Sequence, residues 1–476
     1  MDQERKKFYI TTPIYYVNDK PHIGSSYTTI AADVAARLHR QLGEEVYFLT
    51  GTAEHGSKIA ESAEKAGKDP QAFVNEMSAK FSMAWDILGV APDDFIRTTE
   101  ERHTKAVNLF FNKLKESGKV YEGIYEGWYC VGCESFKKES ELIAGVCPLH
   151  NRKPDWVKEK NWFFKLSEYG PVLLDKIEKQ EMRIRPEGRK NEIVSFIKQG
   201  LEDIAISRRT AKFALPLPWD SEQTIYVWLD ELFNYCSAIG YENNPEQFKK
   251  FWPADYHLVG KDIIKFHCVI WPALLLAIGE QAPSAVFAHG FFTVNGEKMS
   301  KTLGNVIDPV DLSEKYGSDA VRYFLLREVP FGQDGDVSEL KLKTRYNADL
   351  ANGLGNLFSR TTDMIEKYLD GEVDITPSPK DLSDVTEDFM NFNFSEGLIK
   401  IWEAIAWANQ VIDKDKPWEM VKKEPDKAKE LLINLAALLK DIALKLSPVM
   451  PGTSDKMRKV LESDKITKPE PLFKKE

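Results

Sequence analysis

The hydrophobic positions near the N-terminus follow first a strand-like and then a helix-like period. The stretch "YITTPIYYVND" alternates as a strand does. Ile30, Val34 and Leu38 then recur every four residues, which predicts one face of a helix that ends at Gly43. The run "EVYFLTG" at 45–51 predicts a second buried strand. Strand, helix and strand in this order predict a βαβ unit with parallel strands.

A similar pattern returns far downstream. "DYHLVG" at 255–260 predicts a strand, "DIIKFHCVIWPALLLAIG" at 262–279 a helix, and "SAVFAHG" at 284–290 another strand. Residues 120–210 lie between the two halves and carry short strand-like pieces and turn formers. The sequence therefore predicts an α/β fold whose Rossmann-type parallel sheet is split by an inserted subdomain.

From about residue 341 glycine becomes rare and helical spacing dominates. Leu432, Leu435 and Leu439 follow this spacing, and Pro448 and Pro451 are expected to break the last long helix. The C-terminal third is thus predicted to be a helical domain. The predicted domains are the first half of the split domain at 1–119, the insert at 120–210, the second half at 211–340 and the helical domain at 341–476.

Composition narrows the class of protein. The 476 residues are 43% hydrophobic and 29% charged, as in a soluble globular protein. No apolar core of the signal-peptide kind follows "MDQERKK", and the longest apolar stretch is too short to span a bilayer, so we expect a cytoplasmic protein without membrane contact. A net charge of −10 disfavours a protein that holds nucleic acid by charge alone.

The segment "KPHIGSSYT" at 20–28 places a histidine and a glycine where the first strand gives way to the helix. Peptide N–H groups at a helix N-terminus attract anions, His22 can donate a further hydrogen bond to a phosphate, and Gly24 permits close approach. Neither "GxGxxG" nor "GxxxxGK[ST]" occurs, so the common dinucleotide and P-loop motifs have no support. The alternative is a turn that happens to contain a histidine.

A second motif, "VNGEKMSKTLGN" at 294–305, combines a predicted Asn-Gly hairpin turn with two lysines. Lys298 and Lys301 are suited to cover a triphosphate and to stabilise charge that develops as it is attacked. A solvated lysine pair is the alternative, but the pairing with "PHIG" on a split βαβ framework favours a phosphate site.

Three of the five cysteines and one histidine have metal-ligand spacing. Cys130 and Cys133 form a CxxC arm, and Cys147 and His150 form a CxxH arm thirteen residues later. Three thiolates and one imidazole are typical of one structural Zn²⁺ site with no open position. Reduced cysteines beside a stray histidine are the alternative.

"PHIG" and "KMSKT" resemble the HIGH and KMSKS motifs of class I aminoacyl-tRNA synthetases. From about residue 8 to 470, "TTPIYYVND", "FLTGTAEHG", "YVWLDELFNY", "YHLVGKDIIKFHCVIWPA" and "NADLANGLGNLFSR" resemble the methionyl-tRNA synthetase family in order. The resemblance implies that the carboxylate of L-methionine attacks the α-phosphorus of ATP, that pyrophosphate leaves, and that the adenylate then esterifies the 3′ end of tRNA(Met).

The same resemblance assigns residues to these steps. It implies catalytic roles for His22, Lys298 and Lys301. ATP, bound with Mg²⁺, would contact these three together with Gly24, Ser25, Gly260 and Asp262. The methionine side chain would lie among Tyr16, Trp228, Tyr235, Phe266, His267 and Trp271. In the helical domain, which would bind the anticodon, the contacts would be Asn356, Arg360 and Trp418. The family's inserted subdomain often carries a zinc knuckle such as the one predicted here.

Two positions depart from the family pattern. Ser25 replaces the second histidine of the first motif, and Ala53 stands where the family commonly has an aspartate that holds the substrate's ammonium. We hypothesise that Glu54, a backbone carbonyl or water replaces that contact. Because no appended tRNA-binding module follows, we expect a monomer. The rival predictions are a related enzyme that activates valine, leucine or cysteine, and an inactive tRNA-binding paralogue.

Overall fold

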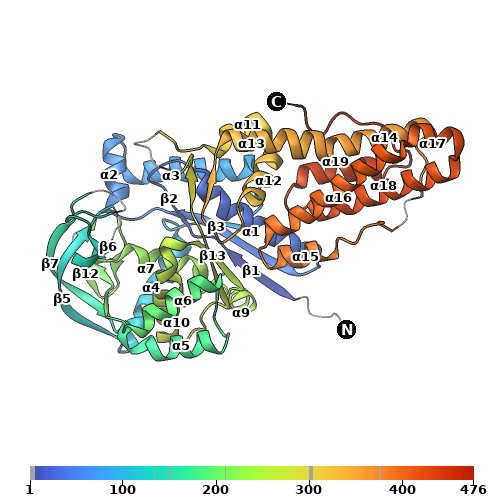
Figure 1. The fold of residues 1–476 in the computed structure, drawn as a ribbon. Helices are drawn as coiled ribbons and strands as arrows, with labels where there is room; N and C mark the ends of the chain where they lie inside the picture. Colours follow the sequence, from blue (N-terminus) through green and yellow to red (C-terminus); the bar gives the residue numbers. More distant parts are fainter. Residues whose placement is uncertain are drawn as a thin grey trace. The chain divides into compact units, whose positions relative to one another are not determined.

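The computed structural model describes residues 6–132, 135–148, 152–209, 211–299, 304–374 and 377–475, without the side chain of Lys298. The chain divides into two compact units (Figure 1). The first comprises Met1–Pro21, Glu44–Met83 and Pro92–His289. The second comprises His22–Gly43, Ala84–Ala91 and Gly290–Glu476. No helix among the described residues combines the length and the apolar character that a membrane span requires.

The first unit is built on a parallel sheet of seven strands in the order β2-β3-β1-β13-β14-β8, with β4 also paired to β3. The strand pairs described in this sheet are all parallel. The strands are β1 (Lys7–Thr11), β2 (Tyr15–Tyr16), β3 (Glu45–Ala53), β4 (Asp94–Arg97), β8 (Arg183–Arg185), β13 (Tyr256–Gly260) and β14 (Ala285–His289). The pairing of β1 with β13 joins the two halves, so the split parallel sheet is confirmed.

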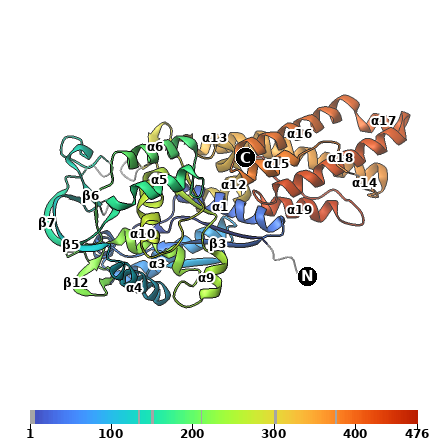
Figure 2. The ribbon, with the colours of Figure 1, turned by 90° about the horizontal axis from the view of Figure 1, so that it is seen from below.

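The insert contributes an antiparallel sheet of four strands, in the order β6-β5-β7-β9. These strands are β5 (Val120–Cys130), β6 (Ser135–Lys137), β7 (Asp155–Phe164) and β9 (Ile204–Ala205). Figure 2 shows α5 (Gly170–Glu178) and α6 (Glu187–Lys198) side by side in the same unit. Strand β8 lies within the range predicted as the insert but pairs with β14 of the main sheet. The predicted domain boundaries stay predictions.

Apolar side chains from the sheet and its helices form the core of the first unit. Leu49 of β3, Val107 and Phe110 of α4 (Glu101–Glu116), Phe233 and Trp271 belong to one buried cluster. The strands are apolar on both faces because helices cover both sides of such a sheet. The predicted helix at 262–279 is not a single α-helix. It is a 3₁₀ turn, then a π-helical segment at Phe266–Ile270, then α10 (Trp271–Ala277).

The second unit combines helices with a three-stranded sheet. Helix α1 (Ile23–Gln41) ends as predicted before Gly43, whose φ of 81° is left-handed. The strands are β15 (Phe292–Val294), β16 (Glu297–Lys298) and β17 (Gly335–Val337). The long helices α14 (Asn356–Leu369), α16 (Phe394–Asp415), α18 (Pro425–Leu446) and α19 (Pro451–Leu461) run alongside one another in Figures 1 and 2. Pro448 follows α18 and Pro451 opens α19, so the predicted break is confirmed.

The remaining helices complete the two units. In the first unit they include α2 (Ser57–Lys65), α7 (Val227–Leu232), α8 (Asn234–Ser237) and α9 (Pro245–Phe251), and α3 (Pro70–Ile87) passes from the first into the second. In the second unit they are α11 (Pro309–Tyr316), α12 (Ser318–Glu328), α13 (Glu339–Arg345), α15 (Ser383–Met390) and α17 (Pro417–Lys423), with a π-helical segment at Tyr346–Gly355.

Candidate functional site

A pocket of about 290 Å³ lies in the first unit, where β1 and β13 end. Strand order reverses at this point, since β3 and β13 pair with opposite edges of β1. Parallel sheets bind ligands outside the carboxyl ends of their strands at such a switch point. The lining residues that follow the two strands include Pro13, Ile14, Tyr16, Asp262 and Ile263. The topology of the sheet therefore positions the pocket.

Five of the six residues predicted to surround the methionine side chain line this pocket. They are Tyr16, Trp228, Tyr235, Phe266 and His267. Trp228 of α7 stacks on Phe266 with ring centroids 4.4 Å apart and an interplanar angle of 17°. Trp271 is not among the described lining residues. It is fully buried and its indole N–H donates to His257 Nε2 at 3.3 Å.

A chain of hydrogen bonds fixes the tautomer of His267. Its Nδ1 lies 3.0 Å from the Ile263 carbonyl oxygen, which can only accept, so Nδ1 carries the proton. Nε2 then accepts from the Tyr235 hydroxyl at 2.8 Å. Burial lowers the pKa of His267 to about 4, so the ring is neutral at pH 7. The hydroxyl proton and the imidazole proton are both engaged within the protein.

Helix α7 is anchored by a buried carboxylate. Asp230 Oδ2 lies 2.6 Å from His55 Nδ1, and Asp230 Oδ1 lies 2.9 Å from His103 Nε2. Burial alone would raise the pKa of Asp230, but the two histidines outweigh it and hold the pKa below its usual range. These contacts orient the helix whose other residues, Trp228 and Glu231, line the pocket.

The sequence did not predict several lining residues, including Glu231, Asn234, Lys58 and Lys137. One signal could have found Glu231. Trp228, Glu231 and Tyr235 are three and four residues apart, a spacing that puts them on one helical face. Two residues predicted to bind the nucleotide lie near this pocket. Gly260 ends β13, and Asp262 is an exposed residue of the pocket lining.

His22 caps helix α1 in the second unit. Its Nδ1 accepts from the Gly24 N–H at 3.1 Å, so the proton of neutral His22 lies on Nε2. Ser25 Oγ donates to the His22 carbonyl at 2.7 Å and lies 3.1 Å from the His22 N–H, completing a capping box. His22 is exposed and Ser25 is buried. The helix N-terminus predicted for this motif is therefore confirmed.

The second motif lies beside the first within this unit. A Cβ on Gly24 would lie 3.0 Å from two atoms of the His22 ring and 3.7 Å from the Met299 side chain. The Ile23 N–H donates to the Ile307 carbonyl at 3.1 Å. Lys298 ends β16, whereas Lys301 and the Lys298 side chain lie outside the described residues. The structure brings the segments together and does not describe the two ammonium groups.

Asp336 holds the hairpin that precedes the second motif. Asn295 and Gly296 form its turn, with φ of 53° and 81° as a type I′ turn requires. Asp336 Oδ1 accepts from the Gly296 N–H at 2.6 Å and from Thr293 Oγ1 at 2.9 Å. The Gly296 N–H, first among several donors, holds the pKa of Asp336 below its usual range. The hairpin is thus tied to β17.

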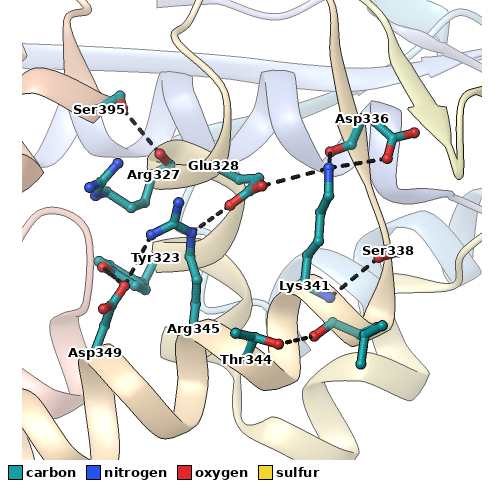
Figure 3. Close-up of polar contacts among 11 residues, drawn as sticks. Tyr323, Arg327, Glu328, Asp336, Ser338, Lys341, Thr344, Arg345, Asp349 and Ser395 are labelled. Atoms are coloured by element: carbon teal, nitrogen blue, oxygen red, sulfur yellow. Dashed lines mark hydrogen bonds and ion pairs between the residues drawn. The ribbon is translucent and has the colours of Figure 1, made fainter.

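A network of charged side chains extends from Asp336 to residues of the neighbouring helices (Figure 3). Lys341 of α13 donates to Asp336 Oδ2 at 3.1 Å and pairs with Glu328 at 3.8 Å. Arg345 bridges Glu328 at 2.5 Å and Asp349 at 3.2 Å. This network connects the hairpin with α12, α13 and the π-helical segment after them.

Two of the four predicted zinc ligands are described. Cys130 ends β5 and Cys147 forms an isolated bridge with Arg152, and both are buried. Cys133 and His150 lie outside the described residues. Within the described ranges, no group of three or more His, Cys, Asp or Glu could hold a metal ion. Gly132 and Ser135, which are close to Cys130 in the sequence, both line the pocket.

The three residues predicted to contact an anticodon come together in the second unit. Arg360 of α14 pairs with Asp413 of α16 at 2.8 Å, and its guanidinium lies 5.8 Å from the Trp418 ring centroid. Asn356, one turn earlier on α14, is exposed beside Asn409. Asn409 and Asp413 were not predicted. Amide, guanidinium and indole groups on adjoining helices suit recognition of unstacked bases.

A family model described as "tRNA synthetases class I (M)" matches residues 8–155 and 138–362. The parallel sheet and the two motifs agree with that match. The chain therefore belongs to the class I tRNA synthetases.

Relatives identify the group within this class. A methionine–tRNA ligase of Thermotoga maritima is 46% identical over 98% of this chain and 80% of the relative. One of Caldanaerobacter subterraneus is 48% identical over 95% of this chain and 73% of the relative. Within the class I enzymes, this chain is a member of the methionine–tRNA ligase family.

Solved structures agree with this assignment. The methionyl-tRNA synthetase of Mycobacterium tuberculosis in complex with methionyl-adenylate is 37% identical, with a TM-score of 0.93 over 98% of this chain and 99% of that chain. The apo form of the same enzyme is 33% identical, with a TM-score of 0.84 over 100% of this chain and 99% of that chain.

Proposed function

We propose that this protein activates L-methionine with ATP and transfers it to the 3′ end of tRNA(Met). The observation that carries the proposal is the pocket at the ends of β1 and β13. Its walls include the aromatic side chains of Tyr16, Trp228, Tyr235 and Phe266, and the volume of about 290 Å³ suits a small apolar side chain. A thioether is polarizable and packs well against aromatic rings. Methionine–tRNA ligases that are 46% and 48% identical to this chain support the same substrate.

The first step joins the methionine carboxylate to the α-phosphorus of MgATP. One carboxylate oxygen attacks phosphorus, the bond to the bridging oxygen breaks, and pyrophosphate leaves with the electron pair. This reaction needs alignment and neutralisation of charge more than a protein nucleophile. His22 Nε2 and the N-terminus of α1 would donate to phosphate oxygens, and Lys298 and Lys301 would offset the charge that develops. Ser25 would act through its cap on the helix.

Two further residues would bind the nucleoside. Gly260, which ends β13, allows close approach of the nucleotide, and Asp262 can accept hydrogen bonds from ribose hydroxyls. In the second step, a hydroxyl of the terminal adenosine of tRNA attacks the carbonyl carbon of the adenylate, and AMP leaves.

The described thiols fit a structural zinc ion. Cys130 and Cys147 are buried sulfur donors in the antiparallel insert, and Cys133 and His150 would complete a tetrahedral set. The ion would tie the two arms together and support the loop at Gly132, without taking part in the reaction.

We assign anticodon recognition to the helices of the C-terminal region. Trp418 would stack on a base, and Asn356 and Arg360 would bind base edges of the CAU anticodon. The test is charging of tRNA(Met) with labelled methionine. Arg360→Ala should raise the KM for tRNA(Met) while leaving tRNA-independent activation unchanged. Arg458→Ala, on the exposed face of α19, is the matched control. Equal KM values for the two variants would contradict the assignment.

A further inference from the structure

The pocket must hold a charged group as well as an apolar side chain. An amino acid carries an α-ammonium, and moving an ammonium from water into an apolar pocket is costly unless a counter-charge or hydrogen bonds replace the water. Ala53, at the end of β3, supplies only a methyl group and is fully buried. The structure must therefore offer another acceptor.

Glu54 is not available for this contact. Its carboxylate accepts from Arg97 Nε at 2.7 Å and from Arg97 Nη2 at 3.0 Å. Thr52 Oγ1 and Thr99 Oγ1 donate to it at 2.7 Å and 2.5 Å. The side chain is fully buried and is absent from the described lining of the pocket. The hydrogen bonds from Arg97 and the two threonines therefore hold the Glu54 carboxylate in the core beside β3.

Among the described residues that line the pocket, the acidic ones are Glu231 and Asp262. Asp262 is exposed, whereas Glu231 is only 7% exposed. A carboxylate in a drier setting interacts more strongly with a cation, because fewer waters compete for it. Glu231 is the acidic side chain on the interior side of the site.

Glu231 also stands among the residues that would hold the methionine side chain. It lies between Trp228 of α7 and Tyr235 of α8 in the sequence, and both of these line the pocket. Burial, and to a lesser degree the charge of Glu231, raise the pKa of the Tyr235 hydroxyl. The carboxylate of Glu231 is therefore within electrostatic reach of the aromatic wall.

We propose that the carboxylate of Glu231 binds the α-ammonium of the amino acid in this pocket. The inference rests on the proposed function and adds to it the group that recognises a free amino acid. In this arrangement Glu231 positions the substrate by binding its ammonium group. The carboxylate of the amino acid then remains available to attack the α-phosphorus of ATP.

The test compares Glu231→Gln, Glu231→Asp and the wild type in methionine-dependent ATP–pyrophosphate exchange. Glutamine keeps the shape and removes the charge, so the methionine KM should rise about 10- to 100-fold, as expected for the loss of a charge-assisted hydrogen bond. The KM for ATP should stay within about twofold. Aspartate keeps the charge and should recover part of the affinity. Glu222→Gln, an exposed glutamate outside the described lining, is the control and should match the wild type.

A substrate analogue separates charge recognition from a structural role. 4-(Methylsulfanyl)butanoate lacks the ammonium, so its inhibition constant against methionine should not rise in Glu231→Gln. An inhibition constant that rises as much as the methionine KM, or a methionine KM that does not change, would overturn the role of Glu231 while leaving the proposed function intact. Wild-type protein that shows no methionine-dependent exchange would overturn both.

Discussion

Breaking the buried ion pair of Arg322 and Asp33 should destabilise the second unit strongly. Both side chains are fully buried, and the nearest N and O atoms are 2.6 Å apart. Arg322 also donates to the carbonyls of Val449 at 2.7 Å and Pro448 at 2.8 Å. One guanidinium thus joins α12, α1 and the turn before α19.

Arg322→Met keeps much of the volume and removes the charge and all five donors. After this substitution Asp33 keeps its ion pair with the partly exposed Arg37, at 2.7 Å. The two buried carbonyl oxygens lose the hydrogen bonds that Arg322 donated to them. Breaking a buried pair in this way costs about 3–5 kcal/mol. The free energy of unfolding of the second unit should fall by that amount. Asp33→Asn in the same background should add little, because the charge it removes has already lost its main partner.

Urea denaturation followed by tryptophan fluorescence and circular dichroism measures the change. Arg458→Met is the matched control. Its pair with Glu462 at 3.3 Å is exposed on both sides, so the loss should stay below about 1 kcal/mol. If the free energy of unfolding of Arg322→Met lies within about 1 kcal/mol of the wild-type value, the reasoning about this buried pair is refuted.

Three further predictions concern the pocket, the first motif and the zinc site. His267 has a folded pKa of about 4, below its unfolded value near 6.5, so the unfolded chain binds more protons between these values. Stability should therefore fall by roughly 3 kcal/mol as the pH drops from about 6.5 to about 4, and urea midpoints should show a shallower slope in His267→Gln. Gly24→Ala should push the His22 ring aside and lower the kcat of exchange roughly 10- to 100-fold, whereas Gly188→Ala, with nothing within 4 Å of the added Cβ, should not. Metal analysis should find one zinc ion per chain, lost in Cys147→Ser and kept in Cys236→Ser.

The sheet and the start of α1 could be predicted because each depends on local sequence. Apolar runs at 45–51 and 284–290 became β3 and β14, since parallel strands are covered on both faces. The position of His22 at a helix N-terminus followed from the change of period around "PHIG". Periodicity and caps are sufficient for such features.

The interior of the pocket could not be predicted in the same way. The helix expected at 262–279 contains a π-helical segment at Phe266–Ile270. Phe266 and His267, the first two residues of this segment, line the pocket. Trp271 was grouped with them by resemblance, yet it packs behind, against His257. Glu231 was overlooked because an acidic residue in a helix is usually solvated, and its burial depends on tertiary packing.

ATP–pyrophosphate exchange in the absence of tRNA, measured with each amino acid in turn, is the decisive assay of methionine activation. We expect exchange that depends on methionine, with valine, leucine and cysteine inactive at comparable concentrations. Exchange driven by another amino acid would contradict the assignment of the pocket. No exchange from folded, zinc-loaded protein would contradict catalysis itself and favour a protein that only binds tRNA.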